Sequence, residues 1–382
     1  MKIHPNIWLL LLLLLLPAGC NRPEDGRGSS DTGRSGRTRP SFLQIGEFTV
    51  TRKSDTLTLV RDGAGRTLAL VPRGTPPPEG FAPAMVVRTP VQRVVAYGFF
   101  DVATLRVLGV LDQVLVGVTT PREKWYVDDV RRGMESGRIR YLGTPAAIDY
   151  EQLRAQAPEL VLTWDPSIIP MLDEMGIPCV ITTTPVAMCL NARMSFVRFL
   201  APFFGRQQEA ERFFHRVSAS LADIRARTAA SLQHPRVMWG DMYEKRVLVE
   251  PGNAWIGELV ALVNGGYLFE DVYGTSCIEI SQERFLYSGR QADIYFTYRT
   301  EKSGATSKAA LARINPLMAG IRPLGPEGRV YIPRPWYSQS GDRLDAIFTE
   351  IAAILHPDVY PGYRLRFFKE LPATDLREKK EK

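Results

Sequence analysis

Histidine is scarce in this sequence, with four in 382 residues. Beyond the N-terminal apolar run only His215, His234 and His356 remain. None of the three falls in a loop that follows a predicted strand, whereas a zinc or manganese site requires several histidines or carboxylates that converge. We therefore expect no metal ion held directly by side chains. The same scarcity argues against a bis-histidine haem and leaves ligation by a tyrosine open.

Catalytic motifs are missing as well. The sequence has no Gly-x-Ser-x-Gly elbow, no Walker loop, no Gly-x-Gly-x-x-Gly after a strand and no Cys/His pair. No pair of carboxylates is singled out for glycoside hydrolysis. The net charge is +7, but no zinc-finger spacing or RNA-binding aromatic motif accompanies it. We expect neither an enzyme nor a nucleic-acid partner, and the positive charge suits a membrane surface or an anionic small molecule.

The first of four cysteines follows a short apolar run. Residues 8–16 are all apolar, which is shorter than the roughly 20 residues that a membrane-spanning helix needs. The run is typical of a signal peptide. The ending Ala18-Gly19-Cys20 resembles a bacterial lipobox, and departs from it at Pro17, where leucine is usual. This predicts cleavage before Cys20 and its lipidation, with an ordinary secretory signal as the alternative.

Three cysteines remain: Cys179, Cys189 and Cys277. An odd number in an oxidising compartment leaves at least one free thiol. Cys179 and Cys189 are close in sequence, but spacing alone does not decide whether they pair.

The N-terminal part of the chain divides into a tether and a small sheet. Residues 21–40 are rich in Gly, Ser, Arg, Asp and Pro and cannot bury enough apolar surface to fold. Residues 41–75 alternate apolar and polar positions, and Asp62-Gly63-Ala64-Gly65 has the composition of a hairpin turn. The alternation predicts a β-meander.

The remainder alternates strands and helices. Apolar strands and helix-spaced segments follow one another over residues 93–182 and again after Pro235, which predicts parallel sheets covered by helices. Between them, residues 194–232 have helical spacing throughout, with Gly205 as an interruption. The predicted fold is α/β, with two Rossmann-like lobes joined by a single long helix and a small N-terminal β-hairpin or meander extension. The predicted parts are a signal peptide (1–19), a tether with Cys20 (20–40), a β extension (41–88), an N-terminal lobe (89–190), a linking helix (191–232), a C-terminal lobe (233–375) and a charged tail (376–382).

Several segments, in this order, resemble one protein family. Residues 93–118 look like its first strand–helix–strand unit, and residues 149–162 like its lobe helix followed by a Pro-Asp-Leu-Val strand, with Glu159 for the aspartate. Residues 251–266 and 280–294 are similar to the start of its second lobe and to the matching helix and strand there. The family is that of the substrate-binding proteins of iron-siderophore, haem and cobalamin ABC transporters, the class III periplasmic binding proteins. His356-Pro357-Asp358-x-Tyr360-Pro361 and the β extension resemble one bacterial branch of it, so the resemblance covers roughly residues 41–370.

The resemblance implies a ligand groove between the lobes, at the carboxyl ends of the strands. Aromatic side chains there suit a bulky, partly apolar ligand, and arginine suits its acidic groups, although aromatic residues at strand ends also cap cores. Trp239 and Trp255 are predicted instead to belong to the core. The candidate ligand-binding residues are Trp125, Trp164, Tyr298, Arg299, Arg334, Trp336, Tyr97, Tyr126, Met242, Tyr243 and Tyr337.

Two glutamates are candidates for contact with a permease. Glu151 and Glu283 each open the equivalent helix of their lobe in the motif alignment. In the family, acidic residues on the two lobes dock onto basic pockets of the permease dimer. Glutamate near a helix N-terminus is also stabilising by itself, by about 0.3–1 kcal/mol.

The resemblance implies a monomeric, lipid-anchored extracytoplasmic binding protein. It would have no intrinsic cofactor, and its partners would be an ABC permease dimer with its ATPase and a small-molecule metal chelate. The positive net charge favours an anionic ferric siderophore as cargo, with haem or a cobamide as alternatives. The other hypothesis is a surface lipoprotein, either an enzyme or a receptor, that acts on a bulky anionic small molecule without transport.

Overall fold

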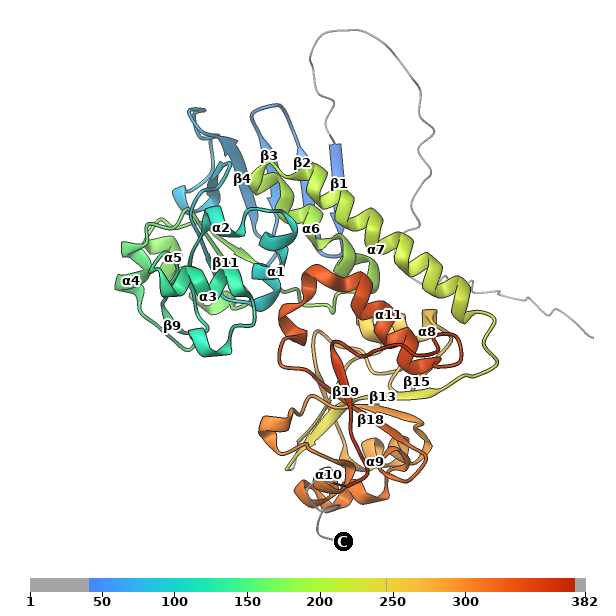
Figure 1. Ribbon diagram of the computed structural model, residues 1–382. Helices are drawn as coiled ribbons and strands as arrows, with labels where there is room; N and C mark the ends of the chain where they lie inside the picture. The colour runs from blue at the N-terminus through green and yellow to red at the C-terminus, as the bar shows by residue number, and fades with distance from the viewer. Residues whose placement is uncertain (1–40, 245, 375–382) are drawn as a thin grey trace, which may run out of the picture. The chain divides into compact units, whose positions relative to one another are not determined.

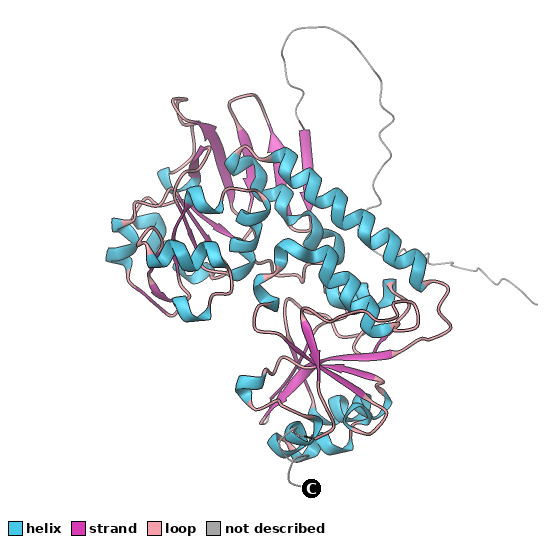
Figure 2. Ribbon diagram, in the orientation of Figure 1, coloured by secondary structure: helices cyan, strands magenta, loops and turns pink. Residues whose placement is uncertain are grey.

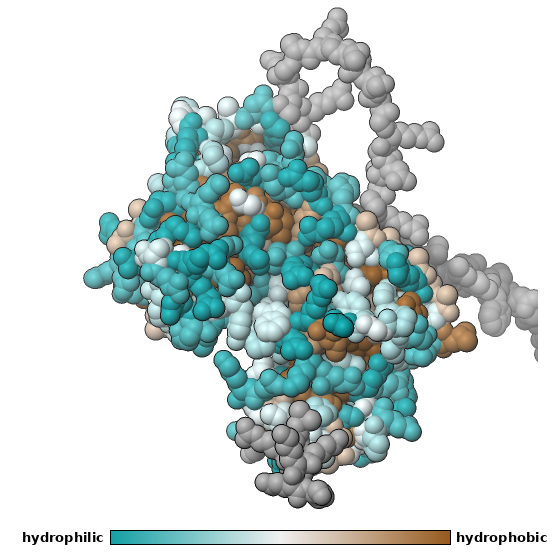
Figure 3. All heavy atoms as spheres, viewed as in Figure 1, coloured by the Kyte–Doolittle hydropathy of each residue, from teal (hydrophilic) through white to brown (hydrophobic). Residues whose placement is uncertain are grey.

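The computed structural model describes residues 41–244 and 246–374, which lie in one compact unit (Figure 1). The predicted signal peptide, Cys20, the tether and the charged tail lie outside the described residues. Figure 2 shows the strands in separate groups with helices around them, as expected for an α/β fold. Hydrophilic residues cover most of the face shown in Figure 3, where hydrophobic residues gather in a few patches. Among the described residues, no helix is both long enough and apolar enough to span a membrane.

The predicted meander is part of a five-stranded sheet with strand order β1-β2-β3-β4-β5. Strands β1 to β4 are antiparallel, and β5 pairs parallel to β4. One face of the sheet packs on the linking helix, where the Phe48 ring lies 5.1 Å from Phe196 and 4.8 Å from Phe199. The strands are β1 (Ser41–Ile45), β2 (Phe48–Arg52), β3 (Thr58–Arg61), β4 (Thr67–Pro72) and β5 (Val86–Thr89).

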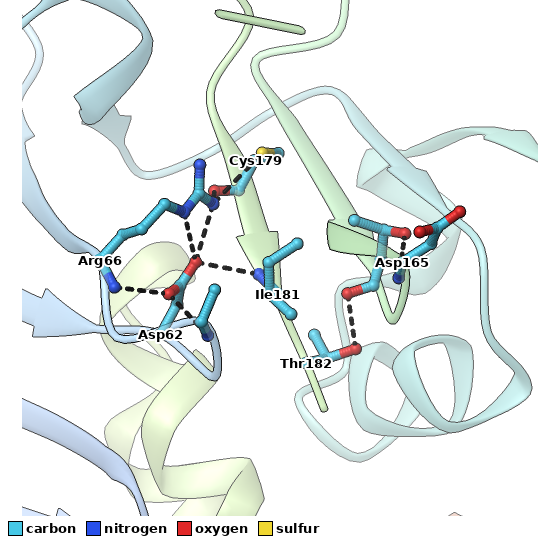
Figure 4. Close-up of polar contacts among 8 residues, drawn as sticks. Asp62, Arg66, Asp165, Cys179, Ile181 and Thr182 are labelled. Atoms are coloured by element: carbon cyan, nitrogen blue, oxygen red, sulfur yellow. Dashed lines mark hydrogen bonds and ion pairs between the residues drawn. The ribbon is translucent and has the colours of Figure 1, made fainter. Parts of the chain in front are cut away.

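The turn between β3 and β4 attaches this sheet to the first lobe (Figure 4). The buried Asp62 carboxylate accepts hydrogen bonds from the backbone N–H of Ala64 and of Arg66, each at 3.0 Å, and from that of Ile181 at 3.2 Å. The Arg66 guanidinium donates to the same carboxylate at 2.7 Å and to the carbonyl of Cys179 at 2.8 Å. One acidic side chain therefore joins two sheets.

Gly63 allows the close approach that this junction needs. Its N–H donates to the carbonyl of Ile181 at 2.9 Å. A Cβ at this position would lie 1.7 Å from the carbonyl oxygen of Thr183, which no side chain permits.

The first lobe is built on a parallel five-stranded sheet with order β12-β11-β6-β7-β8. Four of its strands, β6, β7, β11 and β12, are buried along their whole length, as expected for a parallel sheet that helices cover on both faces. The strands are β6 (Val94–Ala96), β7 (Leu115–Val118), β8 (Arg140–Tyr141), β11 (Leu160–Thr163) and β12 (Cys179–Ile181), beside the small hairpin β9 (Gly143–Thr144) and β10 (Ala147–Ile148). The helices are α1 (Phe99–Val107), α2 (Leu111–Val114), α3 (Asp128–Glu135), α4 (Tyr150–Ala155) and α5 (Ile169–Glu174).

The predicted helical connection between the lobes is confirmed, and it has two segments. Helix α6 (Leu190–Phe204) ends at Gly205, whose φ of 66° is the left-handed conformation typical of a glycine C-cap. Helix α7 (Gln207–Thr228) then continues to the second lobe, where it packs along α11 (Leu344–Leu355). The interruption coincides with the glycine that breaks the helical pattern in the sequence.

The second lobe has a seven-stranded mixed sheet with order β16-β14-β13-β17-β18-β19, and β15 pairs with β13. Strands β13, β15, β17 and β18 are parallel, whereas β14, β16 and β19 pair antiparallel with their neighbours. The strands are β13 (Arg236–Tyr243), β14 (Arg246–Val249), β15 (Gly266–Tyr267), β16 (Ile278–Ile280), β17 (Ile294–Phe296), β18 (Arg329–Pro333) and β19 (Phe368–Glu370). The other helices are α8 (Trp255–Leu262), α9 (Gln282–Gln291) and α10 (Lys308–Ile314).

Candidate functional site

Loops that follow parallel strands of the two lobes contact each other. The Gln339 side chain, after β18, accepts from the backbone N–H of Tyr126 and donates to the carbonyl of Lys124, both at 2.8 Å. The Tyr126 and Trp336 rings meet edge to face across the same boundary, with centroids 6.1 Å apart. The carboxyl ends of parallel strands are where open α/β sheets bind ligands. This boundary is therefore the candidate site.

A cavity of about 240 Å³ lies behind these loops. It combines aromatic walls with one cation and one carboxylate. Its lining comes from α6, α8, α11 and the strands and loops of the second lobe, and includes Arg193, Trp239, Glu250, Trp255, Tyr298 and Tyr337.

A larger hollow of about 660 Å³ lies between the N-terminal sheet and helices α6 and α7. Its charged groups are already paired, Arg198 with Glu211 at 2.7 Å and Arg52 with Asp55 at 2.9 Å. It is not formed by the strand ends of the two lobes, so we do not assign the ligand to it.

Arg193 is the cation of the cavity. Its guanidinium lies 4.0 Å from the centroid of the Phe100 ring and 5.8 Å from that of Trp255. Its Nε is buried and has no hydrogen-bond partner in the part of the chain that the structure describes. Burial lowers the pKa of Arg193 to about 10, although Tyr337, Glu250 and other acidic groups nearby act in the opposite direction. Aromatic rings from both lobes thus hold a charge that the described residues leave without an ion pair.

Glu250 is the carboxylate of the cavity. Its Oε1 accepts from the Tyr298 hydroxyl at 2.9 Å and from the Cys277 thiol at 3.6 Å. Its backbone carbonyl accepts from the Tyr267 hydroxyl at 2.7 Å. Burial raises the pKa of Glu250, and the hydrogen bonds from Tyr298 and Cys277 only partly oppose this rise. These contacts keep Glu250 within its own lobe rather than against Arg193.

Asp101 is a second buried carboxyl close to the boundary, in the first turn of α1. Its Oδ2 accepts from the backbone N–H of Gly98 at 3.2 Å, and its Oδ1 is buried and has no hydrogen-bond partner among the described residues. Burial raises the pKa of Asp101 to about 7, although the nearby Thr182 hydroxyl, the hydrogen bond from Gly98 and the charge of Arg193 act to lower it. The carboxyl is therefore about half protonated at neutral pH.

The raised pKa of Asp101 makes stability depend on pH. The unfolded carboxyl ionises near pH 3.8 and the folded one only near pH 7, so the wild type loses stability as pH rises through this window. Because Asp101→Asn removes the cost of ionising a buried group, we expect the variant to gain about 2–4 kcal/mol relative to the wild type between pH 4.5 and pH 8. Urea unfolding at both pH values measures the difference. Asp112→Asn, at an exposed position, is the control, and a pH dependence equal in Asp101→Asn and the wild type would disprove the prediction.

Seven of the eleven predicted ligand residues are either clearly exposed or buried. Trp164, Tyr126, Trp336 and Tyr243 are partly exposed, with 45%, 40%, 37% and 37% of their surface accessible. Trp125, Tyr97 and Met242 are buried. The Trp125 indole donates to the carbonyl of Thr120 at 3.0 Å and packs edge to face on Phe99 at 5.1 Å. The exposed group can reach a ligand directly, whereas the buried group lies behind it.

The two predicted arginines lie in different surroundings. The Arg299 Nε donates to Asp241 at 3.2 Å and its Nη2 to the carbonyl of Met242 at 2.8 Å. The Arg334 guanidinium lies 5.7 Å from the centroid of the Trp336 ring, and no residue that the structure describes forms a hydrogen bond with its buried Nε. Arg299 is thus engaged within its own lobe, whereas Arg334 keeps a donor available.

Tyr298 and Tyr337 are the two predicted residues that line the cavity itself. Sequence reasoning missed Arg193, Glu250 and Asp101, and it assigned Trp239 and Trp255 to the core. Trp239 is buried and stacks on Phe296 at 4.2 Å, yet it also forms part of the cavity wall, as does Trp255. A wall residue that is also a core residue gives no separate sequence signal.

Glu151 and Glu283 occupy equivalent positions. Each is exposed and is the second residue of its helix, α4 or α9. Each follows a capping residue whose side chain accepts from the third N–H of the helix, Asp149 at 2.9 Å and Ser281 at 3.1 Å. Hydrogen bonds from its own N–H and from Ser281 lower the pKa of Glu283, so it is charged at neutral pH.

Among the described residues, no cluster of three or more His, Cys, Asp or Glu side chains is placed to hold a metal ion.

Comparison with known proteins gives one family. Residues 94–335 match the family model described as periplasmic binding protein. An uncharacterized lipoprotein of Methanocaldococcus jannaschii is 23% identical over 296 residues, which cover 74% of this chain and 69% of that protein.

Solved structures share the fold. A periplasmic haem-binding protein from Pseudomonas aeruginosa superposes with a TM-score of 0.56 at 19% identity, over 75% of this chain and 99% of that one. A possible iron-binding periplasmic solute-binding protein from Staphylococcus epidermidis gives a TM-score of 0.54 at 14% identity, over 72% and 100%.

Proposed function

We propose that this chain, which belongs to the periplasmic binding protein family, captures an iron complex outside the cytoplasm and delivers it to an ABC importer. The observation that carries the proposal is the cavity of about 240 Å³ behind the boundary of the lobes, with tyrosine and tryptophan walls and an arginine. Together with the exposed aromatic residues Tyr126, Trp164 and Trp336, these walls suit part of a bulky ligand that is apolar over much of its surface.

An anionic ferric siderophore is the preferred cargo, with haem or a cobamide as alternatives. The net charge of +7 and the available guanidinium groups of Arg193 and Arg334 favour an anionic ligand. Relatives of the same fold include a haem-binding and a possible iron-binding protein, which supports an iron complex as the class.

The proposed cycle needs little motion. Helices α6 and α7 connect the lobes, and helices resist bending more than extended strands do, so open and closed forms differ little. The cargo occupies the boundary and orders its rim, where Tyr126 and Trp336 meet. The lobes then present Glu151 and Glu283 to the permease dimer, and ATP hydrolysis by its ATPase drives release.

The chain is proposed to act as a monomer, lipid-anchored through Cys20 and without an intrinsic cofactor. The Ala18-Gly19-Cys20 ending supports the anchor, as does a relative that is described as a lipoprotein. Mass spectrometry of the N-terminal peptide from the membrane fraction tests it, since a diacylated Cys20 supports the anchor and an unmodified Cys20 excludes it.

Titration calorimetry tests the binding function. A ferric siderophore, haem and cyanocobalamin are each titrated into the soluble chain without its first 20 residues. One-to-one binding of at least one of the two iron complexes in the micromolar range or tighter supports the proposal. If cobalamin alone binds, the cargo is a cobamide and not an iron complex. If none of the three ligands gives a heat of binding, the proposed function is contradicted.

The exposed tryptophans should contribute to affinity. We expect Trp164→Ala and Trp336→Ala each to weaken binding by about 1–3 kcal/mol, because each removes a large apolar surface from the rim of the site. Tyr287→Ala removes a similarly exposed ring from α9 and should leave affinity unchanged. Unchanged affinity in both tryptophan variants would place them outside the ligand site.

A further inference from the structure

The Arg193 guanidinium has no ion-pair partner among residues 41–244 and 246–374. It lines the cavity and is held by the rings of Phe100 and Trp255, and no group in these residues forms a hydrogen bond with its buried Nε. A buried charge costs several kcal/mol unless it is paired and hydrogen-bonded. Arginine presents five donors in a planar fork that matches a carboxylate.

The acidic groups near Arg193 do not act as its ion-pair partner. Asp101 of the first lobe bonds to the backbone N–H of Gly98, and Glu250 of the second lobe accepts from Tyr298 and Cys277. No ion pair joins Arg193 to either carboxyl in the described part of the chain. Because burial raises the pKa of both carboxyls, their negative charge is weakened where an anion would enter.

The size of the cavity limits what enters it. A volume of about 240 Å³ is below the roughly 300–1,000 Å³ of pockets that enclose a whole drug-sized ligand. It accommodates a side group of a few atoms while the body of a larger ligand stays at the exposed rim. The hydroxyl-bearing residues Tyr337 and Ser338 line the same cavity beside Arg193 and can supply further donors.

We infer that the cavity receives a carboxylate arm of the cargo and that Arg193 binds this arm through a charge-assisted, bidentate hydrogen bond. The cargo is then an iron complex that carries a free carboxylate. This inference rests on the proposed function. It adds that the iron complexes bound are those that carry a free carboxylate.

Two matched pairs of probes test the inference: haem with its dimethyl ester, and ferric citrate with a neutral ferric trihydroxamate. Binding is followed by quenching of tryptophan fluorescence. For the pair that binds, the wild type should prefer the carboxylate member by about 10- to 100-fold, as expected for hydrogen bonds to a charged group. Arg193→Gln should lose this preference and bind the neutral member as the wild type does.

Arg198→Gln is the matched control. It removes the same charge from the same helix, but Arg198 is paired with Glu211 outside the cavity, so the preference for the carboxylate member should persist. An Arg193→Gln variant that keeps the full preference would overturn the inference while leaving the binding function intact. A wild type that binds none of the four probes would contradict the proposed iron-complex function itself.

A measurement without cargo separates a ligand-binding arginine from a structural one. Arg193→Met keeps the apolar stem, and at pH 5.5, where Asp101 is largely protonated, we expect its Tm to equal or exceed that of the wild type. A structural role would lower the Tm by more than about 3 °C, equivalent to about 1 kcal/mol for a lobe of this size, and would overturn the inference.

Discussion

Simultaneous replacement of Glu151 and Glu283 by alanine should abolish uptake of the iron complex and leave its affinity for the binding protein unchanged. Both side chains are exposed second residues of helices in opposite lobes, α4 and α9 (Figure 1). Neither lines the cavity. In the proposed function these carboxylates meet basic pockets of the permease, and complementary charges across such an interface steer encounter and fix register.

Transport is measured as the uptake of radiolabelled iron by cells whose only copy of the protein is the variant or the wild type. Affinity is measured by calorimetry with the purified chains. Glu174→Ala combined with Glu279→Ala is the matched control, since it removes one exposed carboxylate from each lobe at other positions. Normal uptake by the Glu151 and Glu283 double variant would remove these residues from the permease interface. A parallel loss of affinity would show instead that they act on the ligand site.

Asp62→Ala should destabilise the chain by about 3–5 kcal/mol. The carboxylate is fully buried, accepts three backbone N–H groups and pairs with Arg66 at 2.7 Å. Its removal leaves the half-buried Arg66 guanidinium and three backbone N–H groups without their acceptor. Leaving buried charged and polar groups unpaired is strongly destabilising. The N-terminal sheet should separate from β12 before the lobes unfold.

Urea unfolding measures this loss. Asp55→Ala is the control because Asp55 pairs with Arg52 in the same sheet at an exposed position, where a salt bridge contributes about 0–1 kcal/mol. A loss below 1 kcal/mol for Asp62→Ala would show that the turn is not the attachment point of the N-terminal sheet.

Much of the fold could be predicted because its signals are local. The alternation in β2, β3 and β4 marks a half-buried sheet, and the continuous apolar runs of β6 and β11 mark strands buried on both faces. Strand β5 was missed because it follows a proline-rich stretch. The family resemblance, carried by motif order over most of the chain, is confirmed by the match over residues 94–335.

The site was harder to predict because its chemistry depends on contacts between distant segments. Arg193 lies in an amphipathic helix, where an arginine usually indicates a solvated face, and only the fold places it between Phe100 and Trp255. Arg299 satisfied the rule for strand-end residues, yet its donors are directed at Asp241 and Met242 of its own lobe. The position of a residue after a strand predicts that it lies near the site, and the hydrogen bonds decide what it does there.

Native mass spectrometry and the visible spectrum of the chain, purified from the membranes of its own host, test the central claim most directly. We predict one iron complex per chain, with a ligand-to-metal charge-transfer band or a porphyrin absorption band and a mass that matches a carboxylate-bearing chelate. A chain that carries a sugar, an amino acid or a bare metal ion instead, or that carries nothing after growth with iron complexes, would contradict it.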